Sequence, residues 1–354
     1  MMPRRLLVLL LALATAACGH ASSDRYSRSQ AKKALVKLDQ PGVVVGEFHV
    51  TKITDGDTLW VDGLDKSLRL LGLDTEEIFH HPENRRRADD DWEKYLKDMR
   101  GTSPRPVKLE TPVGEAAMAW AKKWFDGVEK VRVERDHPAE IRDRFNRYLA
   151  YVVAEKNGVW LNYNVECVRA GYAPYFTKYG YSRRYHKEFL AALAEAKAAK
   201  RGIWAPGALH APDYAEREAW WNARGEFVAE FRREGEGKPE YIDVTHFDAM
   251  TKLEEYVGKE VHVLGTVDQL RSTKGPLLVM TGKLPLVFFD RNLATASGIE
   301  SWTGEYIVVT GVPTEYEDKR SHRKSVQIQI ERASQIKLSP VPGLELPAVT
   351  ATSP

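Results

Sequence analysis

Two aspartates and an arginine lie close together in a stretch of the chain suited to metal-dependent chemistry. The stretch reads Ile-Thr-Asp-Gly-Asp57-Thr-Leu-Trp and then, after a short interval, Leu-Arg69-Leu-Leu-Gly-Leu-Asp74-Thr-Glu-Glu77. Carboxylates such as Asp57 and Asp74 suit a hard cation such as calcium, and the guanidinium of Arg69 is a planar fork that binds a phosphate at two points. A bound metal ion, an arginine and a further carboxylate are the groups with which a phosphodiesterase can hydrolyse its substrate. Taken alone, however, Asp-Gly-Asp-Thr favours an ordinary turn with solvated acids.

Alternating apolar residues indicate the strands that would position these groups. Leu68 and Leu70 alternate with Arg69, which is the period-two pattern of a strand. Asp62-Gly63 is a turn between this strand and the one before it. A strand pair joined by that turn could bring Asp57 and Asp74 together.

Further motifs follow in order along the chain. They are Asp143-Arg-Phe-Asn-Arg147-Tyr-Leu-Ala-Tyr151, then Val168-Arg-Ala-Gly-Tyr-Ala173, then Gly202-Ile-Trp204. Together with Asp-Gly-Asp-Thr and Arg-Leu-(x)3-Asp-Thr, they resemble the staphylococcal nuclease (thermonuclease) family over residues from about 46 to 206. Because several motifs occur in the same order as in the family, we do not expect the agreement to arise by chance.

The resemblance implies a role for each matching residue. The implied calcium ligands are Asp57, Asp74 and the main-chain carbonyl of Thr75. The implied catalytic residues are Glu77, which would orient or deprotonate the attacking water, with Arg69 and Arg147, which would bind the phosphate. Phe145, Tyr175 and Tyr179 are expected to contact the substrate, although core packing is an equal alternative for the tyrosines. The implied reaction is calcium-dependent hydrolysis of DNA or RNA with low sequence specificity, leaving 3′-phosphate ends.

Three positions depart from the family pattern. Glu76 stands where the family usually has proline, and losing that ring frees the backbone beside Glu77, which can leave the base less well oriented. Phe145 and Asn146 stand where tyrosine and glycine are common. These departures keep a second class open: a catalytically inactive envelope lipoprotein that binds nucleic acid or a protein partner through OB-like domains.

The N-terminus has the three-part form of a secretory signal. Arg4-Arg5 precede an apolar run at 6–13, which is too short for a permanent membrane span, and small residues lead to Cys18. Thr15-Ala-Ala-Cys18 resembles a bacterial lipoprotein processing box, so we expect lipidation at Cys18 and an exported, membrane-anchored protein of the cell envelope. Cleavage after Ala16, which would give a secreted protein, is the alternative.

Cysteine usage and charge narrow the possibilities further. Cys18 and Cys167 are the two cysteines of the chain, and Cys167 lies in an apolar segment that predicts a buried thiol rather than a nucleophile. The formal net charge is +2, and loss of Arg4 and Arg5 with the signal leaves fifty basic residues against fifty acidic ones. Binding of nucleic acid must therefore rest on local patches rather than on overall charge.

The expected fold class is α+β. Five strands at 47–53, 58–61, 68–73, 130–134 and 148–154 and three helices at 113–125, 161–170 and 184–200 predict an OB-type barrel of the staphylococcal nuclease kind. The expected organisation is a signal peptide at 1–18, a tether at 19–45, the nuclease-like domain at 46–207, a helical connector at 208–240, an OB-like domain at 241–339 and a disordered tail at 340–354.

Two segments have no counterpart in the family pattern. The polar insertion at 79–111 contains His80, His81 and the acids at 89–91, whose spacing fits no standard metal site, so a solvated loop is expected. In the second domain, basic residues could form a rim for polyanions: Arg271, Lys274, Lys319, Arg320, Arg323 and Lys324. A structural or partner-docking role for that domain is the favoured alternative.

Overall fold

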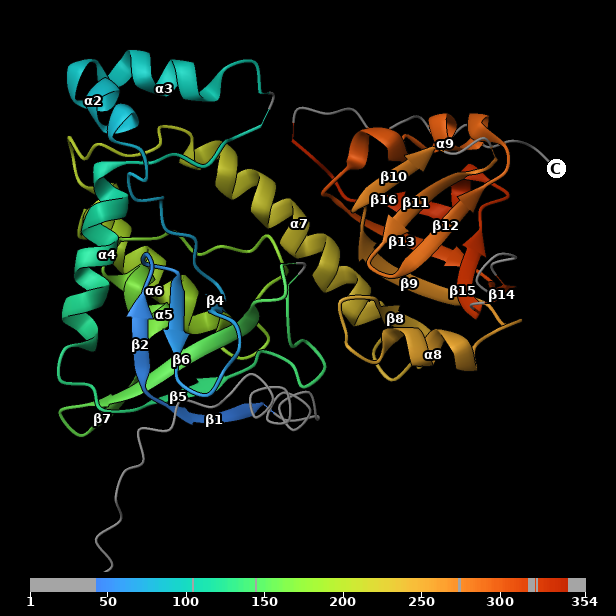
Figure 1. Ribbon diagram of the computed structural model, residues 1–354, viewed down its shortest axis with the longest axis horizontal. Helices are drawn as coiled ribbons and strands as arrows, with labels where there is room; N and C mark the ends of the chain where they lie inside the picture. Colours follow the sequence, from blue (N-terminus) through green and yellow to red (C-terminus); the bar gives the residue numbers. More distant parts are fainter. Residues whose placement is uncertain are drawn as a thin grey trace, which may run out of the picture.

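The computed structural model describes residues 43–103, 105–143, 145–272, 275–317, 322 and 324–342. The signal segment with Cys18, most of the expected tether, and Lys274, Lys319, Arg320 and Arg323 lie outside this part of the chain. Figure 1 shows two bodies, with the long helix α7 (Tyr214–Glu234) running from the first to the second.

A curled sheet forms the first body. Its strands are β1 (Val44–Phe48), β2 (Val50–Ile53), β3 (Thr58–Val61), β4 (Leu68–Leu70), β5 (Val131–Glu134), β6 (Tyr148–Lys156) and β7 (Val159–Asn162). They pair in the order β1-β5-β6-β4-β3-β2, with β7 added on β6. The expected five-stranded barrel is wrong in its strand count, and because β1 and β2 do not pair, no closed barrel is found in the described residues.

The first expected strand, 47–53, is divided at His49. The amide of His49 donates to Oδ1 of Asp62 over 2.6 Å instead of continuing a ladder, and each half takes a different partner strand. β1 pairs with β5, while β2 pairs with β3. An apolar pattern does not reveal such a division, because the side chains alternate in the same way on both sides of it.

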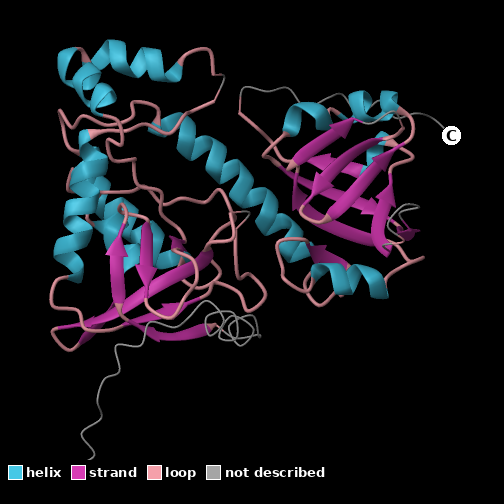
Figure 2. Ribbon diagram, viewed as in Figure 1, coloured by secondary structure: helices cyan, strands magenta, loops and turns pink. Residues whose placement is uncertain are grey.

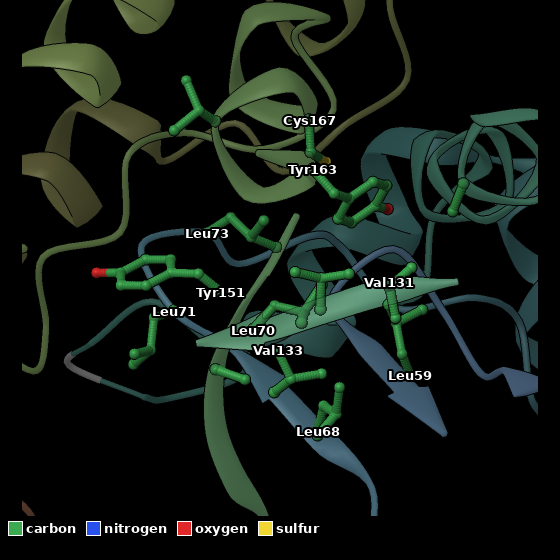
Figure 3. Close-up of a cluster of buried hydrophobic side chains, with 14 of the residues drawn as sticks. Leu59, Leu68, Leu70, Leu71, Leu73, Val131, Val133, Tyr151, Tyr163 and Cys167 are labelled. Atoms are coloured by element: carbon green, nitrogen blue, oxygen red, sulfur yellow. The ribbon is translucent and has the colours of Figure 1, made fainter. Parts of the chain in front are cut away.

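The core lies between the sheet and three helices. These are α4 (Pro112–Phe125), α5 (Tyr163–Arg169) and α6 (His186–Ala198), close to the expected ranges. Figure 3 shows leucines and valines of β3 to β5 packed with Tyr151, Tyr163 and Cys167. Cys167 is fully buried, as expected, and burial raises the pKa of its thiol well above the ordinary value. Removing this apolar surface from water stabilises the frame of the site by about 25 cal/mol per Å².

The insertion at 79–111 is mostly helical, so the expectation of a solvated loop is wrong. It contains α2 (Pro82–Asp90) and α3 (Trp92–Arg100). Pro82 occupies the first turn of α2, and the side chain of Asp91 accepts a hydrogen bond from the amide of Lys94 at the start of α3 over 3.0 Å. Tyr95 and Leu96 are buried against Leu109 and Tyr214, which fixes the insertion on the first body.

The second body contains two sheets rather than one barrel (Figures 1 and 2). The five-stranded sheet has the order β10 (Gln269–Ser272), β11 (Leu277–Thr281), β12 (Leu284–Phe288), β15 (Lys324–Gln329), β14 (Pro313–Glu317). The four-stranded sheet has the order β16 (Ile336–Leu338), β13 (Tyr306–Gly311), β9 (Val261–Thr266), β8 (Tyr241–Asp243). Short helices α8 (Ala249–Glu255) and α9 (Arg291–Ser297) lie at its two ends. A closed OB-like barrel is not found among the described residues.

Two further features of the second body bear on the predictions. Val341 is buried in its core, and the indole of Trp302 donates to the carbonyl of Ser339 over 2.8 Å, so residues 340 and 341 belong to this body rather than to the expected tail, whose remaining residues from 343 lie outside the described part of the chain. Phe227, Val228 and Phe231 of α7 pack against the four-stranded sheet. In the described ranges of the chain, no helix combines the length and the apolar character that a membrane crossing requires.

Candidate active site

The hairpin of β3 and β4 places Asp57 beside Arg69. Thr58 is the register partner of Arg69, and the amide of Leu70 donates to the carbonyl of Asp57 over 3.0 Å. Gly56, just before Asp57, allows the next loop to approach: a Cβ at this position would lie 2.5 Å from Cγ2 of Thr75. The glycine of the Asp-Gly-Asp motif is therefore required by contact with the Thr75 loop.

Arg69 joins the two expected calcium ligands. Its Nη2 donates to Oδ1 of Asp74 over 2.5 Å, and its Nη1 pairs with Oδ2 of Asp57. The amide of Thr75 donates to the same Oδ2 over 3.2 Å. Arg69 is only 4% exposed, and removal of a charge from water costs several kcal/mol unless it is paired. The structure thus brings Asp57, Arg69, Asp74 and Thr75 together.

Glu77 reaches this group through a lysine that sequence reasoning missed. Nζ of Lys108 lies 2.7 Å from Oε1 of Glu77 and 3.2 Å from Oδ1 of Asp74. Lys108 comes from the end of the insertion, thirty-one residues after Glu77. The alternating segment Val107-Lys-Leu-Glu110 is a weak strand signal, but nothing in it predicts that the lysine faces these acids.

The backbone of Glu77 is fixed on both sides. Its amide donates to the carbonyl of Leu109, and its carbonyl accepts from the amide of Thr111, each over 3.0 Å. Gly114, in the first turn of α4, permits this packing, because a Cβ there would lie 2.1 Å from the carbonyl oxygen of Glu77.

We expected that Glu76, which stands where the family usually has proline, would leave the loop before Glu77 less rigid. The structure shows instead that the side chain of Glu76 holds this loop in place. The amide of Ala211 and the hydroxyl of Tyr214 each donate to its Oε1 over 2.7 Å, and the hydroxyl of Thr111 donates to its Oε2. The side chain is buried. Hydrogen bonds to the carboxylate hold the position that a proline ring would have held by restricting φ.

The acids of the site differ in their ionisation. Burial opposes ionisation of Asp74, but Lys108 and Arg69 outweigh it and hold the pKa of its carboxyl well below the ordinary value. Burial and the neighbouring charge of Asp57 raise the pKa of Asp55 to about 7. Asp55 itself accepts a hydrogen bond from the amide of Asp57 over 2.9 Å. Asp74 is therefore an anion at neutral pH, whereas the pKa of Asp55 lies near neutral pH.

The residues present fit a hard divalent cation. Four carboxylates (Asp55, Asp57, Asp74 and Glu77) surround two cations (Arg69 and Lys108), which leaves negative charge in excess when the acids are ionised. The contacts of Asp74 with described residues run through Oδ1, which leaves Oδ2 as a ligand atom. The buried hydroxyl of Thr75 has no hydrogen-bond partner in the described part of the chain. Calcium prefers such oxygen donors, and Asp57, Asp74 and Thr75 would hold it.

Arg147 lies apart from these groups. Its Nε and Nη2 contact Oδ2 of Asp143 over 2.8 and 2.7 Å. β4 and β6 pair in parallel with Arg69 opposite Leu149, and Arg147 precedes that partner by two residues, just before β6 begins. Asn146 adopts φ of 65°, which explains glycine at this position in the family and asparagine as its substitute. Phosphate binding by Arg147 stays a prediction.

The three aromatic residues expected to contact substrate have different environments. Tyr175 is buried, stacks on Phe189 at 4.7 Å between ring centroids and accepts from the amide of Ser182, so its placement favours the core alternative. Tyr179 is 37% exposed and lies near the charge of Arg69. Phe145 is 62% exposed, with the guanidinium of Arg147 over its ring at 5.4 Å. Substrate contact by Tyr179 and Phe145 stays a prediction.

A second cluster of ligand-type side chains lies where the two bodies meet. His137 and Glu140 of the first body adjoin His246 of the second, and the imidazole rings stack at 4.6 Å. Oε1 of Glu140 already contacts Arg232 at 2.9 Å and Arg183 at 3.6 Å. Because two guanidinium groups neutralise the carboxylate, the geometry favours an ion-pair network between the bodies over a metal site.

Comparison with known proteins agrees with this geometry. A family model described as staphylococcal nuclease homologue matches residues 67–206. The chain belongs to the staphylococcal nuclease family. The matched span contains Arg69, Asp74, Glu77 and Arg147, whereas Asp57 precedes it and Ala211 and Tyr214 follow it.

Three curated relatives show the range of similarity. An uncharacterised protein of Methanocaldococcus jannaschii is 32% identical over 157 residues, which cover 44% of this chain and 70% of that protein. Endonuclease YhcR of Bacillus subtilis is 28% identical over 179 residues, covering 49% of this chain and 13% of the relative. Thermonuclease of Staphylococcus intermedius is 32% identical over 139 residues, covering 37% of this chain and 60% of the relative. The chain thus spans less than two thirds of the two relatives named as nucleases.

Proposed function

We propose that this protein is a calcium-dependent nuclease that hydrolyses phosphodiester bonds of DNA or RNA with low sequence specificity. The observation that carries the proposal is the joining of Asp57 and Asp74 by the buried guanidinium of Arg69, with Glu77 linked to them through Lys108. Family membership and two relatives named as nucleases support it.

Each group has a chemical task in this proposal. Bound calcium would supply positive charge at the phosphate and orient it. Glu77 accepts a proton from the attacking water or orients it, and the contact with Lys108 uses Oε1 and leaves Oε2 for that task. Arg69 and Arg147 bind phosphate oxygens and stabilise the added charge of the five-coordinate transition state. The water oxygen forms a bond to phosphorus, the bond from phosphorus to the 5′ oxygen breaks, and the 5′ oxygen takes a proton from solvent and leaves as a hydroxyl, so that the phosphate stays on the 3′ oxygen.

The proposal includes an extracytoplasmic location. The signal-like N-terminus and its box ending at Cys18 support export and a lipid anchor, with secretion after cleavage at Ala16 as the alternative. Calcium is abundant outside cells, and export would also keep the site away from the cell's own genome. DNA or RNA substrate and an anchoring membrane are thus the proposed partners.

The test is cleavage of single- and double-stranded DNA by a soluble form beginning after Cys18, with calcium or with a chelator. We expect cleavage in calcium only, 3′-phosphate ends, and loss of cleavage in Arg69→Ala. Arg233→Ala, at an exposed position of α7, is the matched control and should keep the parental rate. A folded parental chain that does not cleave either substrate contradicts the proposal.

A catalytically inactive binding protein is the second candidate, and one observation favours it. Both ends of the Arg69 guanidinium are already occupied by buried carboxylates, so the group must exchange a partner to meet a phosphate. In that case the folded chain would bind nucleic acid or an envelope protein through its two bodies without turnover. Binding of labelled DNA together with absent cleavage in calcium would establish this candidate.

A further inference from the structure

We propose that Glu76 is a positioning residue whose carboxylate ties the loop carrying Glu77 to helix α7, so that Glu77 and Lys108 are aligned by a segment outside the family match. The match ends at residue 206, whereas Ala211 and Tyr214 lie beyond it. The proposal rests on the proposed nuclease function and deepens it, because it extends the active site of this chain past the family domain.

The carboxylate of Glu76 connects three parts of the chain. From one side, the hydroxyl of Thr111 donates to Oε2, and Thr111 also caps α4 by accepting from the amide of Gly114 over 3.1 Å. From the other side, Ala211 and Tyr214 donate to Oε1, each over 2.7 Å. A buried carboxylate with donors on both oxygens has one favourable orientation, which fixes the backbone next to Glu77.

Helix α7 also restrains the segment that carries Lys108, on the other side of the Glu77–Lys108 pair. The buried Arg217 donates through Nη2 to the carbonyl of Val107, and its Nε donates to Oδ1 of Asp213 over 2.5 Å. Val107 immediately precedes Lys108, as Glu76 immediately precedes Glu77. The helix therefore restrains the residue before each partner of the Glu77–Lys108 pair.

These contacts surround a small cavity. Its volume is about 10 Å³, and Glu76, Lys108, Tyr214 and Arg217 are among its lining residues. That is space for roughly one water. The loop, the segment 105–111 that carries Lys108 (the lysine segment) and α7 are therefore closely packed, so empty space between them cannot absorb a shift of α7.

The second body supports the same segment. Arg105, three residues before Lys108, contacts Oε1 of Glu305 at 2.6 Å. Glu305 is fully buried, and its Oε2 accepts from Arg224 and from the indole of Trp220, both on α7. Helix α7, the lysine segment and the second body thus share one carboxylate, which gives the C-terminal body a structural role in the site.

Among the described residues, the side chain of Glu76 hydrogen-bonds to Thr111, Ala211 and Tyr214 and to none of the side chains expected to bind metal or phosphate, so its loss should act on turnover rather than on binding. In the full soluble chain we expect Glu76→Ala to lower kcat about tenfold or more with KM changed less than about threefold. Glu76→Gln should rescue most of kcat, because its amide oxygen accepts from Ala211 and Tyr214 and its NH₂ donates to Thr111. Tyr214→Phe, which keeps the ring, should lower kcat by about three- to tenfold.

The matched control is Tyr316→Phe, at an exposed tyrosine of β14, which should leave kcat and KM unchanged. Parental kcat in folded Glu76→Ala overturns the proposal, and so does a loss in Glu76→Gln as large as that in Glu76→Ala. If Glu76→Ala does not fold, Tyr214→Phe decides: parental kcat in that variant overturns the proposal.

Hydrogen exchange separates this proposal from the nuclease function itself. If the folded parental chain does not cleave DNA, the proposed nuclease function is wrong, but the positioning role of Glu76 can still be tested by hydrogen exchange. The amides to follow are those of Glu77 and Thr111, because they form the hydrogen bonds between the loop and the lysine segment. We expect faster exchange of these amides in Tyr214→Phe than in the parent and in Tyr316→Phe. Equal exchange overturns the proposal.

Discussion

At the scale of single residues, the chemistry depends on a guanidinium that contacts two carboxylates at once. Arg69 reaches Asp57 through Nη1 and Asp74 through Nη2, and its own charge is stabilised because both partners are buried with it. A lysine offers a single ammonium group and cannot span both carboxylates or grip a phosphate at two points.

Arg69→Lys should therefore lower kcat by about 10²–10³-fold, the usual loss when a transition-state donor is removed. The measurement is initial rates of DNA cleavage in saturating calcium, with circular dichroism to verify folding. Lys337→Arg, at an exposed position of β16, is the reverse substitution at a residue with no expected role in the site, and it should keep the parental rate. A rate for Arg69→Lys within about threefold of the parent would contradict the two-point contact.

At the scale of elements, the site depends on close packing of the Thr75 loop on the turn before β3 and on α4. Gly56 makes this possible, since a Cβ there would lie 2.5 Å from Thr75 and 3.1 Å from Ala117. The neighbours are a β-branched side chain and a helix, so relief requires the loop itself to move.

Gly56→Ala should weaken calcium binding at least tenfold and cost about 1–3 kcal/mol of stability. Calcium affinity is measured by isothermal titration and stability by urea unfolding. Gly127→Ala is the comparison: it adopts φ of 71° with open space around it, so it costs about 1 kcal/mol of stability through backbone strain alone. Unchanged calcium affinity in Gly56→Ala would contradict the packing argument.

The helices of the insertion show why hydrophobic periodicity in the sequence does not predict every helix. In α2 only Ala88 is buried, so the helix has no apolar stripe to recognise. Its start at Pro82 and the side-chain cap at Asp91 are local signals that could have been used. The acids at 89–91 that suggested a solvated loop instead end one helix and begin the next.

At the scale of the whole molecule, the two bodies are joined through buried ion pairs. Arg224 is 1% exposed and its Nη1 pairs with Glu305 of the second body. Removing one partner of such a pair leaves an uncompensated buried charge.

Glu305→Gln should lower the free energy of unfolding by about 3–5 kcal/mol. The free energy of unfolding is measured by urea unfolding. Glu331→Gln, at an exposed position, is the matched control and should change the free energy of unfolding by less than about 0.5 kcal/mol. A Glu305→Gln chain as stable as the control would contradict the role of this pair between the bodies.

The histidine pair between the bodies makes stability depend on pH. Burial, then the charges of Arg183 and His246, lower the pKa of His137 to about 4, against about 6.5 in an unfolded chain. Between these values the unfolded chain binds more protons, so stability should fall as pH falls from about 6.5 towards 4. Since the side chain is partly exposed, we expect a loss of about 1–2 kcal/mol.

Comparison of unfolding curves at pH 7 and pH 4.5 isolates this contribution. His137→Gln should lose less stability than the parent over that range, whereas His49→Gln, at an exposed histidine, should lose as much as the parent. Identical pH dependence in His137→Gln and the parent would show that His137 is not the group responsible.

The sequence by itself determined what depends on local order. The period-two strands, helices α4, α5 and α6, the buried Cys167 and the acids and arginine of the motifs all follow from residues close together in the chain, where propensity and spacing act directly. The positions of Asp57, Arg69, Asp74 and Glu77 within one site were anticipated on that basis and on resemblance.

Only the tertiary structure decided what joins distant segments. Lys108 meets Glu77 from thirty-one residues away, and Tyr214 meets Glu76 from 138 residues away. The division of the first strand at His49 and the two sheets of the second body likewise depend on which strands become neighbours. Such contacts are selected by packing and by the need to pair buried charges, and neither is visible in the spacing of residues along the chain.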